Sequence, residues 1–208
     1  RRGWEEIAIE LRTHESVLAV VNTRRDCREL HRLMPEETIH LSASMCGEHR
    51  SRVVGGIRER LKQKVLTRVV STQLVEAGVD IDFPVVYRAL SGLDSIAQAA
   101  GRCNREGALD LGKVVVFVPP QCAPPGTLRR AEQTTVSLLS GSESDPMARE
   151  LFTRYFEHFY LKADSLDKQG IQDLLTTDAR GLKIQFRTAA EKFKLIDDVE
   201  SQAILVWY

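Results

Sequence analysis

The residues best suited to chemistry stand in one short stretch, residues 95–107, with the sequence SIAQAAGRCNREG. On a helix, Gln98, Arg102 and Arg105 fall at positions i, i+4 and i+7 and therefore share one face. Two guanidinium groups at this spacing can bind phosphate oxygens and neutralise the charge that develops in phosphoryl transfer. An interior glycine costs a helix about 1 kcal/mol relative to alanine, so we expect Gly101 to admit a ligand or a facing backbone. The pattern alone is equally compatible with a solvated helix face.

A second group of polar residues precedes this stretch, in residues 71–82 with the sequence STQLVEAGVDID. Thr72 comes at the end of an apolar run, so it should lie at the carboxyl end of a strand, where ligands of open α/β sheets bind. Asp80 and Asp82 follow Gly78 and alternate with apolar residues, which places both carboxylates on one side of an extended segment. For Asp82 a turn that faces water is the simpler interpretation.

The elements that must position these residues follow from the hydrophobic pattern. From residue 17 to residue 118 the chain alternates between apolar β-branched runs and amphipathic stretches, which predicts parallel strands joined by crossover helices. We therefore expect an α/β fold, a doubly wound and mainly parallel sheet with helices on both faces. The predicted strands are residues 17–22, 38–43, 65–72, 84–90 and 113–120, and the predicted helices are residues 4–16, 23–34 with Asn22 or Thr23 as the N-cap, 47–64 and 94–106.

The strand pattern stops after residues 119–126, PPQCAPPG, whose prolines and glycine are typical of a domain exit. We therefore divide the chain into a sheet domain, residues 1–126, and a mostly helical C-terminal extension, residues 127–208. Within the extension, helices are expected near residues 127–139, 146–161 and 165–175. Residues 186–198 are expected to form a helix or an irregular clasp, and the apolar residues 203–208 could form an edge strand.

The overall composition does not indicate which molecule the protein binds. The 208 residues suffice for one domain with an appendage, and 29 basic residues balance 29 acidic ones. A neutral total gives no global attraction to nucleic acid or membranes, although it does not exclude a local basic patch. No apolar run of about 18 residues and no leader peptide is visible, so we expect an intracellular protein. Because the chain begins at Arg1 rather than at methionine, we expect it to be a piece of a longer protein.

The four cysteines do not suggest a metal site. Cys27, Cys46, Cys103 and Cys122 are far apart, with no C-x-x-C pair and no histidine at the spacing of metal ligands. We expect them to be reduced and to serve mostly as core residues.

Taken together, the two polar segments form a more specific pattern than either does alone. A strand end, a glycine turn, an aspartate and the sequence Q-x-x-G-R-x-x-R follow one another within about 35 residues. This order resembles motifs V and VI of superfamily 2 helicases, here residues 71–82 and 98–105. With VVNTRRDCREL, HLSASMCGEHR and FRTAAEKFKLIDD, it resembles the CRISPR-associated helicase-nuclease of type I systems. The resemblance covers most of the chain and is strongest over residues 17–120.

The resemblance implies that the chain is the second of two RecA-like lobes, with ATP in the cleft between them. ATP and Mg²⁺ would be held mainly by the first lobe. Arg102 and Arg105 would be arginine fingers on the γ-phosphate, and Gln98 would position the attacking water or the γ-phosphate. Gly78 and Asp80 would line the nucleotide side of motif V.

The resemblance also implies a path for single-stranded DNA. Thr72 would face the DNA backbone, and Gly101 would lie at the nucleotide. Further phosphate contacts are expected from four polar residues that follow strands, Asn22, Thr23, Ser42 and Ser44. Roles as helix N-caps or in turns explain these four residues equally well.

Several expected parts of the complete enzyme are missing from this sequence. It contains no G-x-x-x-x-G-K-[ST] loop for phosphates, no Asp-Glu motif for the metal and the water, and no paired His-Asp metal cluster of a nuclease. We therefore expect no metal site in the chain, and we expect that by itself it neither hydrolyses ATP nor cuts DNA.

The expected partners follow from the resemblance too. They are single-stranded DNA, a first RecA-like lobe and a nuclease domain of the same parent chain, and the type I CRISPR surveillance complex, in the prokaryotic cytoplasm and without a membrane. Translocation would run 3′ to 5′. Two alternatives stay open: the second lobe of another superfamily 2 helicase, such as an RNA helicase or a restriction-type translocase, and a non-catalytic α/β interaction module.

Overall fold

The computed structural model describes residues 1–140, 145–161, 165–177, 179–193 and 207. The chain divides into two compact units, Arg1–Phe159 and Tyr160–Trp207. This division falls inside the helical extension that the sequence suggests, and the boundary at residue 126 stays a prediction. Within the described part of the chain, no helix combines the length and the apolar character needed to cross a membrane.

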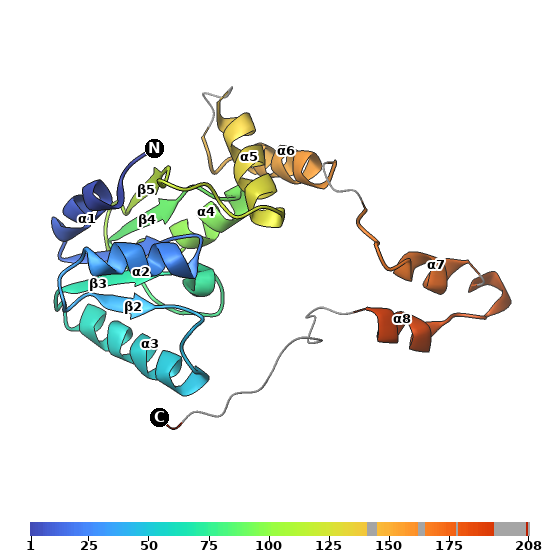
Figure 1. Ribbon diagram of the computed structural model, residues 1–208, viewed down its shortest axis with the longest axis horizontal. Helices are drawn as coiled ribbons and strands as arrows, with labels where there is room; N and C mark the ends of the chain where they lie inside the picture. Colours follow the sequence, from blue (N-terminus) through green and yellow to red (C-terminus); the bar gives the residue numbers. More distant parts are fainter. Residues whose placement is uncertain (141–144, 162–164, 178, 194–206, 208) are drawn as a thin grey trace. The chain divides into compact units, whose positions relative to one another are not determined.

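The first unit is built on a five-stranded parallel sheet, which confirms the α/β, RecA-like fold class (Figure 1). The strands lie in the order β2-β3-β1-β4-β5, so β1 is central, as in a doubly wound fold. In register, Leu18 of β1 stands opposite Val69 of β3 and Val86 of β4. The strands are β1 (Ser16–Val20), β2 (Ile39–Leu41), β3 (Thr67–Ser71), β4 (Val85–Ala89) and β5 (Lys113–Phe117).

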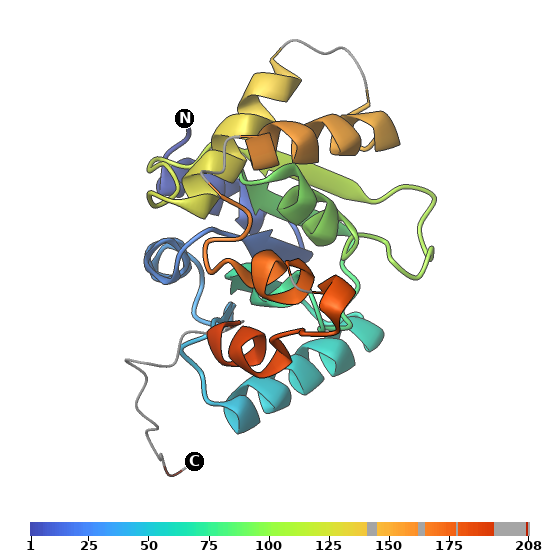
Figure 2. The same cartoon turned by 90° about the vertical axis from the view of Figure 1, so that its right-hand side faces the viewer.

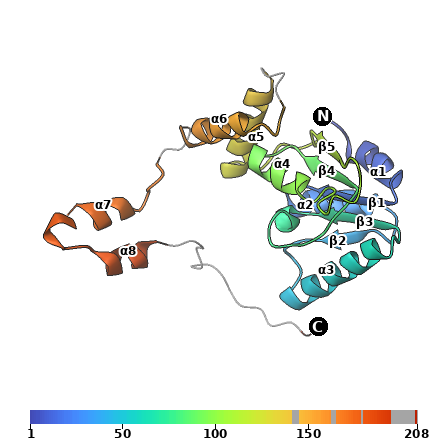
Figure 3. The same ribbon diagram turned by 180° about the vertical axis from the view of Figure 1, so that it is seen from behind.

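Helices cover both faces of this sheet (Figure 1 and Figure 3). Successive side chains of a strand point to opposite faces, and in β1 both sets are buried: Val17 and Ala19 pack in one core cluster, Leu18 and Val20 in the other. The first cluster contains residues of α1 (Trp4–Arg12) and α2 (Arg24–Arg32), and the second contains residues of α3 (Gly47–Lys62) and α4 (Leu93–Ala100). Burial on both faces explains why the strands read as continuous apolar runs.

The N-terminus of α2 shows which of the two expected caps is used. Thr23 has an extended backbone, and its hydroxyl accepts a hydrogen bond from the backbone N–H of Asp26 at 3.0 Å. Thr23 is therefore the N-cap, and α2 begins directly after the carboxyl end of β1.

The predicted helix at residues 94–106 is wrong at its C-terminal end. α4 ends at Ala100, and Gly101 is its C-cap rather than an interior glycine. The next residues pair with a more distant strand-like segment: Phe83 donates its N–H to the carbonyl of Arg102 at 2.9 Å, and Asn104 donates to the carbonyl of Phe83 at 2.9 Å. Because these backbone groups are used in a parallel bridge, they cannot make the i to i−4 bonds of a helix.

A tight segment joins β3 to β4. It starts with one turn of 3-10 helix, η1 (Gln73–Val75), after the extended residue Thr72. Gly78 follows with φ +70°, a left-handed conformation that glycine adopts at little cost. This segment carries the predicted motif V except for Ser71, which ends β3.

Two further helices follow, α5 (Thr127–Leu139) within the first compact unit and α6 (Arg149–Leu161) with all but its last two residues in that unit. They cross one another (Figure 2) and pack with the start of α4 through Leu93, Leu138 and Tyr155. The Tyr155 hydroxyl donates a hydrogen bond to Asp94 at 2.9 Å, and the neighbouring Gly92 leaves no room there for a Cβ. Both helices were expected from the sequence.

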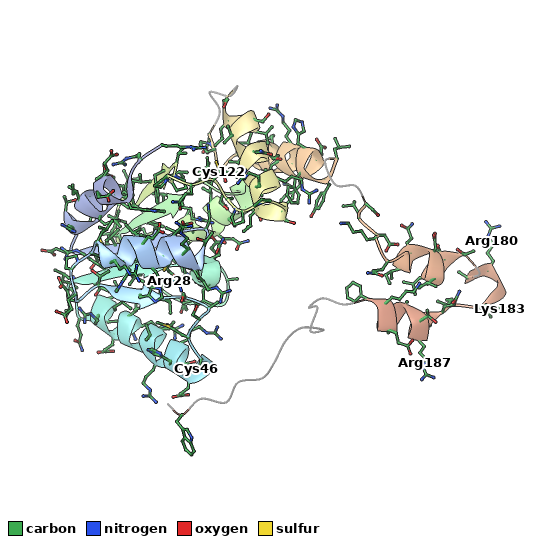
Figure 4. All side chains as sticks on the ribbon, viewed as in Figure 1. Arg28, Cys46, Cys122, Arg180, Lys183 and Arg187 are labelled. Atoms are coloured by element: carbon green, nitrogen blue, oxygen red, sulfur yellow. The ribbon has the colours of Figure 1, made fainter. Side chains whose placement is uncertain are left out.

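The second unit is small and holds α7 (Ile171–Thr176), the 3-10 turn η2 (Ala179–Gly181) and α8 (Phe186–Lys192). α7 and α8 lie side by side, and the N–H of Gln185 donates to the carbonyl of Leu174 at 3.1 Å. Arg180, Lys183 and Arg187 project outward from this unit (Figure 4). The helix expected at residues 186–198 is confirmed over α8, whereas residues 194–198, and residues 203–208 apart from Trp207, lie outside the described residues.

Candidate functional site

The candidate site lies at the carboxyl edge of the sheet, where three neighbouring strands end. Asn22 follows β1, Ser42 follows β2 and Thr72 follows β3. The backbone pairing continues one step past the strands, since Val21 donates to the carbonyl of Ser71 at 2.9 Å and Thr72 donates to that of Leu41 at 3.2 Å. The structure therefore brings the expected polar residues of the three segments to one edge.

Arg102 joins the segment after α4 to the segment after β3. Its Nε donates to the carbonyl of Val75 at 2.8 Å, and its Nη2 donates to the carbonyl of Glu76 at 2.7 Å. Partial burial lowers the pKa of Arg102 below its ordinary value, and the nearby charge of Arg105 lowers this pKa further. Motifs V and VI are thus held together by hydrogen bonds from one side chain.

Arg105 and the two aspartates of motif V make a second connection. Arg105 Nη1 lies 3.1 Å from Asp80 Oδ1, and both side chains are largely exposed. Asp82 accepts hydrogen bonds from the backbone N–H groups of Arg105 at 2.7 Å and Glu106 at 3.2 Å. The interpretation of Asp82 as a carboxylate that merely faces water is therefore wrong, because both of its oxygens anchor the motif VI segment.

The early end of α4 also changes how the three predicted catalytic residues lie. Gln98 is exposed on the last turn of α4, whereas Arg102 and Arg105 follow the helix. They do not share one helical face, and each arginine is directed by its own partner. Gly101 is exposed, and a Cβ added there would meet only the helix carbonyls of Gln98 and Ala97, at 3.4 and 3.5 Å. Its role as a place of close approach stays a prediction.

A cavity of about 450 Å³ opens beside Gly78. Two arginines of α3, Arg50 and Arg58, stand on its wall, and Arg58 Nε donates to the carbonyl of Asp80 at 2.5 Å. Residues 50, 54 and 58 are spaced by four, so they fall on one face of the helix. This spacing was the signal in the sequence for a basic wall, and the interpretation of the motifs missed it.

Asn22 and Thr23 are both engaged within the protein. The Asn22 side chain is nearly buried; its Nδ2 donates to the carbonyl of Leu90 at 2.8 Å, and its Oδ1 accepts from Arg88 at 2.7 Å. Thr23 caps α2 and is partly exposed. Their contacts to DNA phosphates stay predictions.

The remaining predicted nucleic-acid residues differ in accessibility. Ser42 is buried, and its hydroxyl lies 3.4 Å from the backbone N–H of Ser44, which donates to it. Ser44 itself is exposed, and Thr72 has 5% exposure. Ser44 is therefore accessible to a ligand through its side chain, whereas Thr72 offers only a small part of its surface.

A buried ion pair lies below the site and was not recognised from the sequence. Arg88 Nη2 lies 2.9 Å from Glu76 Oε1, with side-chain exposures of 0% and 7%, and Ser95 donates to Glu76 Oε2 at 3.0 Å. Burial lowers the pKa of Arg88, which the Glu76 charge opposes; burial also raises the pKa of Glu76, which Arg88 opposes. The signal was an arginine inside the apolar strand sequence PVVYRAL.

The cysteines and possible metal ligands were also located. All four cysteines are free, and burial raises the pKa of the Cys27 thiol to about 12, which makes it a poor nucleophile. Among the described residues, no group of three histidine, cysteine, aspartate or glutamate side chains could hold a metal ion.

Comparison with known proteins points to one family. Residues 13–108 match the family described as CRISPR-associated nuclease/helicase Cas3, C-terminal. The chain is 53% identical to the CRISPR-associated nuclease/helicase Cas3 of Haloferax volcanii over 51 residues, 24% of this chain and 5% of that protein. It is 31% identical to the Cas3 of Methanothermobacter thermautotrophicus over 111 residues, 50% of this chain and 13% of that protein. The aligned parts thus span only a small part of these relatives.

Solved structures agree on the fold. The crystal structure of T. fusca Cas3 with ATP superposes with a TM-score of 0.59 at 16% identity, over 90% of this chain and 24% of that one. A CRISPR RNA-guided surveillance complex in a pre-nicking state contains a chain that superposes with a TM-score of 0.52 at 15% identity, over 85% of this chain and 24% of that one.

Proposed function

We propose that this chain, whose residues 13–108 match the Cas3 C-terminal family, is the second RecA-like lobe of an ATP-dependent helicase that moves along single-stranded DNA. The observation that carries the proposal is the connection between residues 73–82 and residues 98–106, at the carboxyl edge of a parallel sheet. Ligands of open α/β sheets bind at this edge. CRISPR defence, the surveillance complex as a partner and a nuclease domain in the same parent protein are parts of the same proposal.

The residues present suit the phosphates of ATP. Among the described residues, the Arg105 side chain has only a solvent-exposed pair with Asp80; such pairs contribute little free energy, so Arg105 can turn to a phosphate with little loss of stability. Arg102 has five N–H donors, and its bonds to three backbone carbonyls leave some of them for another acceptor. ATP supplies a γ-phosphoryl group whose transfer to water releases free energy. Gln98, Gly78, Asp80 and Gly101 complete this half of the nucleotide site, and the first lobe supplies the P-loop and the ligands of Mg²⁺.

Single-stranded DNA is proposed to run across the same edge. Thr23 and Ser44 are accessible polar residues that follow β1 and β2, and Thr72 follows β3 between them in the sheet order. Asn22 and Ser42 are buried, so their part is to hold the backbone of these loops. Closing of the two lobes around the nucleotide then moves the edge relative to the DNA, in the 3′ to 5′ direction that the family resemblance suggests.

The test uses the full-length protein that contains this chain and a P-loop lobe. Arg102→Ala should lower the rate of DNA-stimulated ATP hydrolysis by about 10³-fold, the lower end of what an arginine finger contributes. Arg32→Ala is the matched control, because Arg32 is an exposed arginine at the C-terminal end of α2, away from the site. Undiminished ATP hydrolysis by Arg102→Ala would contradict the assignment of Arg102 as an arginine finger. Stimulation by single-stranded RNA but not DNA favours the RNA helicase instead.

A further inference from the structure

A fully buried cation lies between the two halves of the proposed site. Arg88 is on β4, next to the central strand, and its partner Glu76 closes the turn after β3. Taking two charges out of water is costly, and apolar residues of similar volume often replace such a pair without loss of stability. Stability alone is therefore a poor reason for this pair, and its place in the fold suggests another.

The contacts of Arg88 reach the first loop of the site. Its Nη1 donates to Asn22 Oδ1 at 2.7 Å and to the carbonyl of Ala89 at 2.8 Å. Asn22 lies two residues after the end of β1, and its own carbonyl accepts a hydrogen bond from Gln73 Nε2 at 2.9 Å. One end of the 73–76 turn is thus connected to Arg88 through Asn22.

The contacts of Glu76 reach the other half of the site. Its side chain accepts from Ser95 on α4, and its backbone carbonyl accepts from Arg102 Nη2 at 2.7 Å. Any shift of Glu76 therefore moves an acceptor of the proposed arginine finger. Because Thr72 directly precedes the turn, the turn spans the distance from the DNA side to the nucleotide side.

The contact between the two charges depends on where the turn lies. Glu76 Oε1 and Arg88 Nη2 are 2.9 Å apart, and Arg88 Nε has no hydrogen-bond acceptor within the described residues. A small movement of the turn can therefore align or separate the pair, and in a buried environment either change alters its energy strongly.

We propose that Arg88 and Glu76 are positioning residues that couple DNA binding at the edge near Thr72 to the placement of Arg102. The inference rests on the proposed function. Arg88 lies outside the helicase motifs identified in the sequence, and Glu76 lies within motif V. Coupling of this kind changes how strongly DNA acts on the nucleotide site, so its readout is the ratio of ATP hydrolysis rates with and without DNA.

The decisive variant is the double substitution Glu76→Gln/Arg88→Met in the full-length protein. It replaces the charged pair by neutral side chains of similar size, and the new glutamine amide retains an acceptor for Ser95. We expect single-stranded DNA binding, measured by fluorescence anisotropy with an oligothymidylate, and ATP hydrolysis without DNA to stay within about twofold of wild type. Stimulation by DNA should fall about tenfold, within the usual range for coupling between two sites.

The matched control removes a second arginine–glutamate pair of the same sheet, as Glu37→Gln/Arg68→Met. Arg68 lies near the amino end of β3, and its Nη1 is 3.4 Å from Glu37 Oε1, at the edge away from the site. This control should keep the wild-type stimulation. If the decisive variant does not fold, Arg88→Lys is measured in its place; lysine keeps the charge but cannot contact Asn22 and Glu76 with a planar fork, so stimulation should still fall.

Each outcome decides the question. Wild-type stimulation in the folded variant overturns the proposal, and so does an equal loss of the rates with and without DNA, which indicates a merely structural role. A wild-type protein that DNA does not stimulate at all contradicts the proposed function itself, and the coupling with it. Loss of stimulation with retained DNA affinity and retained basal rate supports the coupling.

Discussion

The two ends of the sheet use the same pair of residue types in opposite ways. At the amino end, Arg68 lies near the surface, with 11% side-chain exposure, and its partner Glu37 is half exposed. Arg68 also donates to the carbonyls of His14 and Arg12, at 2.8 and 2.9 Å, and so ties the end of α1 to β3. At the carboxyl end, Arg88 and Glu76 are buried beneath the candidate site.

The two pairs differ in the free energy needed to remove their charges from water. A pair in which one partner stays in contact with water, such as Arg68 with the half-exposed Glu37, requires less desolvation and contributes little free energy. A buried pair requires desolvation of both ions and hydrogen bonds for their remaining groups. The buried pair lies at the end of the sheet that holds the proposed motor residues. Functional sites are where proteins are expected to contain residues that do not maximise stability.

The largest expected effect is a difference in the free energy of unfolding when the buried pair and the pair at the other end of the sheet are disrupted. Arg88→Met leaves the carboxylate of Glu76 buried without its cation, so we expect the free energy of unfolding to fall by about 3–5 kcal/mol. Glu37→Gln at the other end of the sheet neutralises the half-exposed partner of Arg68 and keeps the hydrogen bonds of Arg68 to the carbonyls of His14 and Arg12, so it should cost about 1 kcal/mol or less. Urea unfolding followed by circular dichroism measures both. Equal losses in the two variants would show that the buried pair is no different from the exposed one.

An intermediate effect is expected at the two aspartates of motif V. Asp82→Ala removes the acceptor of two backbone N–H groups, those of Arg105 and Glu106, and should cost about 1–3 kcal/mol. Asp80→Ala, which removes only the exposed partner of Arg105, should cost about 0–1 kcal/mol. Thermal unfolding of the two variants compares them directly. A larger loss for Asp80→Ala contradicts the assignment of Asp82 as the anchor of the motif VI segment.

The weakest of these effects is a pH dependence. Burial raises the pKa of Glu76 above its ordinary 4.5, so between that value and the raised pKa the folded protein holds a proton that the unfolded chain has lost. Stability from this group is therefore complete below pH 4.5 and declines as the pH rises through the window. Relative to Glu76→Gln, the free energy of unfolding of the wild-type protein should decrease from pH 4 to pH 6. A wild-type protein that gains stability relative to the variant over this range contradicts the raised pKa.

The sequence was a good guide to the sheet and a partial one to its edge. All five strands were found, because strands buried on both faces are continuous apolar runs. The predicted helix over residues 94–106 was too long, because no local pattern reveals that the backbone after Gly101 pairs with Phe83. The candidate residues gather where expected, yet their partners depend on that early helix end.

The buried ion pair could not be predicted from sequence motifs. Arg88 and Glu76 stand 12 residues apart, and nothing in their spacing says that they meet. Their contact follows from the crossover that places β4 beside β1 and the β3 turn above both. In the same way, Asn22 suited both a phosphate contact and a structural role, and its two hydrogen bonds to Leu90 and Arg88 became evident only in the fold.

The order of residues along the chain was enough to predict the α/β class, the five strands, the order of the motifs and the resemblance to a helicase family, because these depend on local periodicity and on residues adjacent in the chain. The folded structure was needed to show that Arg102 bonds to the backbone of residues 75 and 76, that Asp82 anchors residues 105 and 106, and that an ion pair lies beneath them. These contacts join residues 10 or more positions apart, and side-chain direction, burial and desolvation at such distances are set by packing rather than by neighbours in sequence.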